Sequence, residues 1–363
     1  MSFNIPSQQT QIVLRERPTA AIKDTLGAAD STYEKRTVPV PTEAELADGE
    51  VLVRVEYVSL DPAMRGWLRD ARSYLPPVQI GEVMRAGGVG TVVASKFAGL
   101  AKGDQVSGTL GWQQYARLPG KTVEKRTIRQ GGSLLDFLGP LGSSGQTAYW
   151  GIEDVAAVKK DDVVVVTGAA GSVGTIAVQL AKLKGAKVIA VAGADDKCEW
   201  LKKSLGADEA LNYKAPNFRQ TYRDLVIKKY GYIDAIFENV GGSILDMSLL
   251  CMKPHGRIAL CGAISDYNNP KPDGLKNYQT IIAMRIKLQG FIVFDYLKRY
   301  AEAEDNMARW MNEGKLARKF HVVGEQHDAQ ARAQGKSLEE CPRALNDLFA
   351  GKNVGKMVVR VAP

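Results

Sequence analysis

The sequence predicts an α/β fold with a doubly wound parallel sheet, accompanied by a second, β-rich domain. From about residue 147 onward, apolar runs of four to six residues alternate with segments of helical period, which is typical of parallel strands joined by crossover helices. Earlier in the chain, β-branched runs broken by glycine, at residues 51–55 and 89–93, predict strands and turns. The length of 363 residues fits two domains at roughly 100–200 residues each.

The elements of the α/β region can be assigned in chain order. Four valines at 163–166 predict a strand, because the run is too short and too β-branched for a good helix. In the helix that follows, Ile176, Leu180 and Leu183 share one face, and Gly185 stands where a left-handed residue would end it. Beyond it we expect a strand at 187–192, a helix at 196–205, strands at 233–237, 258–261 and 288–294, a helix around 296–311, a polar loop-like stretch at 325–336, and a closing helix and strand within 342–361.

The composition is that of a soluble globular protein, with 45% hydrophobic and 24% charged residues. No run approaches the roughly 18 apolar residues that cross a bilayer, and the first ten residues lack the pattern of an export signal. The four cysteines are widely spaced and never form CxxC, so neither a disulfide framework nor a structural zinc site is expected. These features predict a cytoplasmic protein without a membrane partner.

The net charge of +8 comes from 48 basic and 40 acidic residues. A surplus of that size could favour nucleic acid, acidic lipid or phosphate-bearing cofactors. The basic residues are scattered among acids and match no nucleic-acid-binding motif. A solvated surface with a mild basic bias is therefore the preferred interpretation over nucleic-acid binding.

A glycine-rich turn follows the valine strand and is the main candidate for a binding site. Gly168, Gly171 and Gly174 stand between the strand and the next helix, in a GxxGxxG spacing. A strand, a glycine turn and a helix N-terminus together give a diphosphate close backbone approach, outward donors and a favourable dipole. The context therefore predicts a dinucleotide site, and the alternative is that these glycines only permit tight packing of strand against helix.

The end of the second strand indicates which dinucleotide binds. An NAD site would place a carboxylate there, but the strand ends in Ala192 and Gly193, and Lys197 follows in the first helical turn. A lysine there can meet a 2′-phosphate, which favours NADPH. Asp195 and Asp196 argue mildly for NAD, unless they are an N-cap and a first-turn acid of the helix. Lys197 as an ordinary exposed lysine stays the alternative.

Several motifs in order carry a family resemblance. The stretch 168–186 resembles the medium-chain dehydrogenase/reductase superfamily. More narrowly, the chain resembles its zinc-independent branch of prostaglandin reductases, also called leukotriene B4 12-hydroxydehydrogenases, and NADPH-dependent alkenal double-bond reductases. The motifs that carry this narrower resemblance are VSLDPAMR at 58–65, FENVGG at 237–242, CGAISDYN at 261–268, GFIV at 290–293 and NVGK at 353–356.

This resemblance implies a GroES-like catalytic domain from residues 1–146 and 300–363, with a Rossmann NADPH-binding domain at 147–299 inserted in it, and a homodimer. It also implies where NADPH binds. The diphosphate would lie along the glycine turn, and the 2′-phosphate near Lys197 and Tyr213. The cofactor-binding residues expected in this way are Gly168, Gly171, Ser172, Val173, Gly174, Lys197, Tyr213, Asn239, Cys261, Gly262, Ala263, Ile264, Ser265, Tyr267, Phe291, Ile292, Val293 and Asn353.

A catalytic metal is not expected. Zinc-dependent relatives need a cysteine and a Gly-His-Glu motif early in the chain, where this sequence has Leu60-Asp61-Pro62 and Gly81-Glu82-Val83. The chain departs from the branch in two places. Ala63 stands where a tyrosine is common, and the polar stretch 325–336 looks like an insertion.

The hypothesis for the chemistry is conjugate reduction of an α,β-unsaturated aldehyde or ketone, a small-molecule substrate. Hydride would come from the nicotinamide to the β-carbon, while the protein stabilises enolate charge and delivers a proton to the α-carbon. Tyr267 is the candidate catalytic residue, and its alternative role is packing on the cofactor. Cys261 is interpreted as a small buried residue rather than a nucleophile, and His255 as a loop residue.

Two other functions stay open at this point. One is a zinc-free NADPH quinone oxidoreductase, which the motifs at 61–65 and 261–268 disfavour. The other is a non-catalytic protein that binds NADPH or associates with nucleic acid.

Overall fold

The computed structural model describes residues 5–362, which divide into two compact units. The first unit takes the described residues up to Leu138, then Phe320–Lys352 and the residues from Lys356 on. The second unit takes Gly139–Lys319 together with the short segment Asn353–Gly355. Both ends of the chain thus contribute to the first unit, and the second is inserted between them.

The second unit is built on a six-stranded sheet in which every pairing is parallel. Its order is β10-β9-β8-β11-β12-β13. The chain therefore winds outward from β8 in one direction and from β11 in the other, so the predicted doubly wound α/β fold is confirmed. The strands are β8 (Val163–Val166), β9 (Lys187–Ala192), β10 (Glu209–Asn212), β11 (Ile233–Glu238), β12 (Met252–Leu260) and β13 (Lys287–Gly290).

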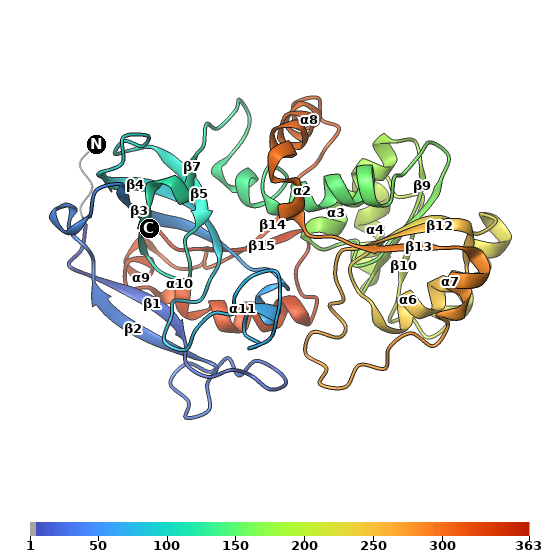
Figure 1. Ribbon diagram of the computed structural model, residues 1–363, viewed down its shortest axis with the longest axis horizontal. Helices are drawn as coiled ribbons and strands as arrows, with labels where there is room; N and C mark the ends of the chain where they lie inside the picture. The colour runs from blue at the N-terminus through green and yellow to red at the C-terminus, as the bar shows by residue number, and fades with distance from the viewer. Residues whose placement is uncertain (1–4, 363) are drawn as a thin grey trace. The chain divides into compact units, whose positions relative to one another are not determined.

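Helices cover both faces of this sheet (Figure 1). All four valines of β8 are buried, as an unbroken apolar run in a parallel sheet predicts. Val163 and Val165 join a core cluster with side chains of α5 and α6, and the apolar side of α3 contributes Ile176 and Leu180 to the core. The helices of this unit are α2 (Ser143–Trp150), α3 (Ser172–Leu183), α4 (Asp195–Leu205), α5 (Phe218–Asp224), α6 (Gly242–Leu249), α7 (Gln279–Met284) and α8 (Tyr300–Asn312).

Three predicted elements of this unit differ from the structure. The strand expected at 288–294 ends earlier, at Gly290. Its pairing partner β12 ends at Leu260, which pairs with Gly290, so the residues after Gly290 do not pair with β12. A 3₁₀ turn occupies Val293–Arg299, so α8 begins four residues later than the expected helix. His255 lies inside β12, not in a loop, at a left-handed φ of 63° where the register against β11 shifts.

The first unit is β-rich, as predicted. Its seven-stranded sheet has the order β14-β15-β3-β4-β5-β7, with β6 also paired to β3, and β1 and β2 form a separate antiparallel pair. The stretch 325–336, expected to be loop-like, contains α9, whose N-cap Asp328 accepts a hydrogen bond from the Ala331 backbone. The strands are β1 (Gln8–Leu14), β2 (Tyr33–Pro39), β3 (Glu50–Ser59), β4 (Gly87–Ser95), β5 (Gln105–Thr109), β6 (Tyr115–Pro119), β7 (Val123–Lys125), β14 (Phe320–Val323) and β15 (Lys356–Arg360); the helices are α1 (Met64–Trp67), α9 (Ala329–Ala333), α10 (Lys336–Glu339) and α11 (Cys341–Phe349).

Candidate functional site

The glycine turn lies between β8 and α3, at the carboxyl edge of the sheet. Gly168 has a φ of 57°, and the Gly171 backbone N–H donates to the Gly168 carbonyl at 3.0 Å. A Cβ at residue 174 would lie 2.3 Å from the Gly168 oxygen and 2.8 Å from the Ala169 Cα, so no larger residue fits there. Ser172 and Val173, both half-buried, form the first turn of α3. The turn therefore presents backbone and a helix N-terminus at its surface, as an anion site requires.

A segment from far along the chain closes this turn. The Gly355 backbone N–H donates to the Ala170 carbonyl at 2.8 Å, and Gly355 forms an isolated β-bridge with Gly171. Asn353 is buried, and its carbonyl accepts a hydrogen bond from Lys197 Nζ at 2.7 Å. The predicted residues Gly171, Lys197 and Asn353 are thus brought together by Asn353–Gly355, which belongs to the same unit as the sheet.

Lys197 lies in the first turn of α4, at the end of β9. Burial lowers the pKa of its ammonium group. Asp195 and Asp196 are exposed and lie in the first turn of α4, as one of the two structural alternatives predicted. The N-cap is Ala194, so the prediction that one of these acids is the N-cap is wrong. Asp195 accepts a hydrogen bond from Asn212 Nδ2 at 2.9 Å.

Tyr213 directly follows β10 and covers Gly193. A Cβ at residue 193 would stand 2.9 Å from the Tyr213 ring, so only glycine leaves this approach open. The Tyr213 backbone N–H donates to the Ala192 carbonyl at 2.9 Å, which fixes the tyrosine at the end of β9. Lys214 reaches over the same ring at 5.8 Å, so a second cation stands at this edge.

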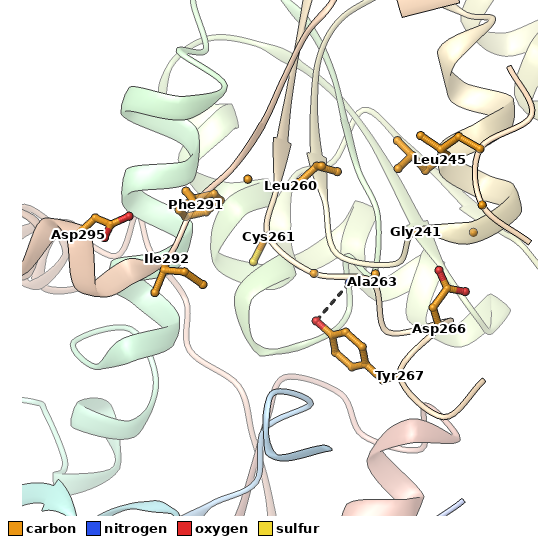
Figure 2. A pocket seen from close by; sticks show the side chains of 15 residues that line it. Gly241, Leu245, Leu260, Cys261, Ala263, Asp266, Tyr267, Phe291, Ile292 and Asp295 are labelled. Atoms are coloured by element: carbon orange, nitrogen blue, oxygen red, sulfur yellow. Dashed lines mark hydrogen bonds between the residues drawn. The ribbon is translucent and has the colours of Figure 1, made fainter. Parts of the chain in front are cut away.

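On the other half of the sheet, a pocket of about 600 Å³ opens where β11, β12 and β13 end. Figure 2 shows Phe291, Ile292 and Asp295 on one side of the Cys261–Ala263 backbone, and Gly241, Leu245 and Asp266 on the other. The predicted residues that line it are Cys261, Gly262, Ala263, Tyr267, Phe291 and Ile292. Most of the lining is apolar, which suits a flat ring or an apolar substrate.

The remaining predicted residues border this pocket without lining it. Asn239 donates from Nδ2 to the Thr167 carbonyl at 2.7 Å, and its own carbonyl accepts from the Ile264 backbone at 3.1 Å. Ser265 donates from Oγ to the Val240 carbonyl at 2.7 Å. Val293 begins the 3₁₀ turn, and its carbonyl accepts from the Tyr300 hydroxyl.

Tyr267 is half-buried at the pocket wall. Its phenolic oxygen accepts a hydrogen bond from the Ala263 backbone N–H at 3.2 Å (Figure 2). A phenol oxygen that accepts a hydrogen bond has a more polarised O–H bond, which makes the O–H a better hydrogen-bond donor. The phenol therefore lies in the pocket wall with its oxygen held by the Ala263 N–H.

Cys261 lies beside the same loop. Burial, and secondarily the neighbouring Glu238, raise the pKa of its thiol to about 12. A thiol with such a pKa is a poor nucleophile at neutral pH. The residue is half-buried and lines the pocket, so it is less buried than the sequence predicted.

Two residues that matter here were missed from the sequence. Thr167 directly follows β8, Glu238 ends β11, and the hydroxyl of Thr167 donates to Glu238 Oε1 at 2.7 Å. A signal existed, since Glu238 directly follows the apolar run 233–237 and an acid at the end of a buried strand is unusual.

The residues at the glycine turn and at the end of β9 have the chemistry that a dinucleotide site needs. Gly174 lies directly against the backbone of the turn, Gly355 bridges to Gly171, and Lys197 supplies a cation at the β9 end. The donor set fits a diphosphate and an additional phosphate group. Within residues 5–362 no group of three or more His, Cys, Asp or Glu side chains could hold a metal ion, and no helix is long and apolar enough to span a bilayer.

Two family models match the chain. One, described as the N-terminal domain of oxidoreductase, matches residues 10–126, and the other, described as zinc-binding dehydrogenase, matches residues 172–312. They fall mainly on the first and second units respectively.

Known proteins resemble the chain over nearly its whole length. It is 38% identical to NADPH-dependent curcumin reductase of Escherichia coli over 321 residues, which are 87% of this chain and 88% of that protein. It is 35% identical to 2-alkenal reductase (NADP(+)-dependent) of Nicotiana tabacum over 356 residues, 97% of each chain. The crystal structure of CurA from Vibrio vulnificus in complex with NADPH matches with a TM-score of 0.86 and 38% identity, covering 98% of this chain and 99% of that one.

Proposed function

The chain belongs to the medium-chain dehydrogenase/reductase family, and from that premise we propose that it is an NADPH-dependent reductase of the C=C bond of α,β-unsaturated aldehydes and ketones. One observation carries the proposal. The carboxyl ends of the strands, where we propose that the dinucleotide binds, also border an apolar pocket. One phenol, that of Tyr267, lies in the wall of this pocket. The names of the tobacco and E. coli relatives point to the same class of substrate.

The residues proposed to hold NADPH divide between the two halves of the sheet. At the β8–β9 half, the backbone of the glycine turn and the N-terminus of α3 face the diphosphate. Lys197 and Tyr213 face the 2′-phosphate, which an ammonium group binds strongly when partly buried. At the other half, the loops after β11, β12 and β13 receive the nicotinamide end.

The chain's own residues set up the reaction. When bound, NADPH supplies the hydride that reduces the β-carbon. Tyr267 donates a hydrogen bond to the carbonyl oxygen of the substrate or a proton to the α-carbon, and its oxygen is fixed by the Ala263 N–H. Phe291 and Ile292 exclude water from one wall of the pocket, which strengthens that hydrogen bond.

A substrate panel tests the proposal. Oxidation of NADPH is followed at 340 nm with a simple enal, an enone, a phenylpropenal and a quinone, and each assay is repeated with NADH. We expect turnover of the enal and enone with NADPH, little with NADH, and a saturated carbonyl product. Turnover of the quinone alone would instead identify a quinone oxidoreductase, and binding of NADPH without turnover would identify a non-catalytic protein.

We also propose that the protein is a homodimer. β13 forms one edge of the six-stranded sheet, and an open edge is a template for pairing with another strand. Large apolar side chains stand exposed on the flanking α7 and 3₁₀ segments, with Ile282 73% and Leu297 59% exposed. A second copy of the chain would cover both the edge and these side chains.

For localisation we propose the cytosol. All four cysteines are free thiols, and three of them are buried, as in proteins of a reducing compartment. Microscopy or fractionation of cells that express the tagged protein tests this.

A further inference from the structure

Glu238 has no place in the function proposed so far, yet it lies at the centre of the site. It is the last residue of β11, and none of its surface is exposed. One of its carboxyl oxygens, Oε1, accepts three hydrogen bonds: from Thr167 Oγ at 2.7 Å, from the Val240 backbone N–H at 2.6 Å and from the Gly241 backbone N–H at 2.8 Å. A buried side chain thus holds the end of its own strand and the end of the neighbouring β8.

The network around Glu238 extends to a third strand. The Glu238 backbone carbonyl accepts from the backbone N–H groups of Cys261 and Gly262, at 2.9 and 3.1 Å, where β12 ends. Thr167 Oγ, which donates to Oε1, accepts in turn from the Asn239 backbone N–H at 2.9 Å. The loops after β8, β11 and β12 therefore meet at this one residue.

The surroundings of Glu238 favour a neutral carboxyl group. Burial raises its pKa, although the three hydrogen bonds at Oε1 act in the other direction. Its titratable neighbours are the thiol of Cys261, directly after β12, and the phenol of Tyr222 on α5. Among residues 5–362 no lysine, arginine or histidine forms an ion pair with it, and Oε2 has no hydrogen-bond partner. The contacts at Oε1 need only an acceptor oxygen at this position.

The position of the network in the sheet decides which part of the cofactor it affects. Lys197 and Tyr213, at the 2′-phosphate end, are fixed through Asn353 and Ala192 and share no hydrogen bond with Glu238. Of the residues that line the pocket, Gly241 is held by Oε1 of Glu238, whereas Cys261 and Gly262 are held by its backbone carbonyl. A dinucleotide lies across the carboxyl ends of the strands, so the two ends of the molecule meet different loops.

We propose that Glu238 is the positioning residue for the nicotinamide half of the cofactor site, acting through Oε1 as an acceptor that holds the loops after β8 and β11 in one arrangement. The inference rests on the proposed use of NADPH. It separates the site into two halves that substitutions can distinguish. Loss of the acceptor loosens the loop after β11, where Gly241 lines the pocket, and leaves the adenosine half intact.

The test compares two ligands on two variants, by calorimetry with the full chain. NADPH occupies both halves of the site, whereas 2′,5′-ADP lacks the nicotinamide and occupies only the adenosine half. Glu238→Gln keeps a neutral acceptor oxygen, so we expect both dissociation constants within about threefold of wild type. Glu238→Leu leaves three donors unsatisfied, and we expect NADPH to bind about 10- to 100-fold more weakly while 2′,5′-ADP stays within about threefold.

Controls separate this role from a general loss of structure. Tyr222→Phe removes another buried hydrogen bond of the same unit, to Ser248, and is expected to change neither dissociation constant. Lys197→Ala is expected to weaken both ligands. If Glu238→Leu does not fold, Thr167→Val, which removes one bond to Oε1, is expected to weaken NADPH alone by about threefold to tenfold.

The outcomes that overturn the proposal are distinct. Equal weakening of NADPH and 2′,5′-ADP in Glu238→Leu would show a structural role only. Unchanged NADPH binding in that variant would show that the loops need no support from the side chain at residue 238. If Glu238→Gln bound NADPH as weakly as Glu238→Leu, an acceptor oxygen alone would not be enough to hold the loops. Failure of the wild-type protein to bind NADPH would instead refute the proposed function.

Discussion

Tyr267 is the residue on which the proposed chemistry depends. Replacing it by phenylalanine keeps the ring against the pocket wall and removes the O–H, so we expect kcat with an enone to fall by about 10- to 100-fold. The KM for NADPH should change little. Stopped-flow or steady-state assays measure both values.

A matched control exists in the same unit. Tyr278, at the start of α7, is 55% exposed, and Tyr278→Phe is expected to keep full activity. An unchanged kcat in Tyr267→Phe would leave this tyrosine a packing role only.

Lys197 gives the site a pH dependence. Its ammonium group attracts the 2′-phosphate only while protonated, and burial lowers its pKa below the ordinary value of about 10.4. The affinity for NADPH should therefore be constant near neutral pH and fall as the pH rises through the pKa of Lys197, at a lower pH than an exposed lysine would give. Titration of the dissociation constant between about pH 7 and 10 measures this.

Two comparisons isolate the lysine. NADH has no 2′-phosphate, so its affinity should not follow the same curve, and Lys197→Arg should keep NADPH affinity to higher pH because arginine stays charged. A parallel pH dependence for both cofactors would assign the titration to another group.

The sequence made Lys197 a candidate through its position after the second strand, but its hydrogen-bond partner could not be predicted. Asn353 lies 156 positions away in the sequence, and only the fold places its carbonyl at Lys197 Nζ. Glu238 was visible as an acid after an apolar run, yet its three donors come from a turn and a neighbouring strand whose pairing the sequence does not state.

At the scale of elements, the turn between β8 and α3 has no room for a side chain at residue 174. In Gly174→Ala the new Cβ would meet backbone atoms of Gly168 and Ala169, which cannot move without opening the turn. We expect NADPH to bind at least about 30-fold more weakly, with a lower melting temperature. Calorimetry and a thermal melt check both effects.

Gly66→Ala is the control for this substitution. Gly66 lies in the short helix α1 with no atom within 4 Å of a Cβ, so the change should leave cofactor affinity unaltered and not lower stability. Tight NADPH binding by Gly174→Ala would show that the turn adapts.

The sequence predicted the strands well where both faces of the strand are buried, because such strands consist of an unbroken apolar run. Val163–Val166 and Lys187–Ala192 have the bounds expected from their apolar runs. β10 (Glu209–Asn212) was missed, because at the sheet edge its four residues are only half-buried and carry no apolar run. The end of β13 was wrong for a related reason: pairing with β12 stops at Gly290, although apolar residues continue to residue 294.

At the scale of the molecule, the edge strand and its exposed neighbours predict self-association. Light scattering after size exclusion should give twice the chain mass of 39.5 kDa. Ile282→Lys places a charge on the exposed face of α7 and should shift the mass toward that of one chain. Leu250→Lys, at an exposed site beyond α6, is the control and should leave the mass unchanged. A wild-type protein with the mass of a single chain would contradict the proposed dimer.

The segment Asn353–Gly355 has a consequence for biosynthesis. The ribosome adds these residues more than 30 positions after Lys319, when every strand of the six-stranded sheet has already been translated. Until then Lys197 lacks its carbonyl partner and the glycine turn lacks its bridge to Gly355. We therefore expect that a nascent chain can form its parallel sheet on the ribosome before it can bind the coenzyme tightly. Tight binding of the coenzyme would begin only after residues 353–355 have been added.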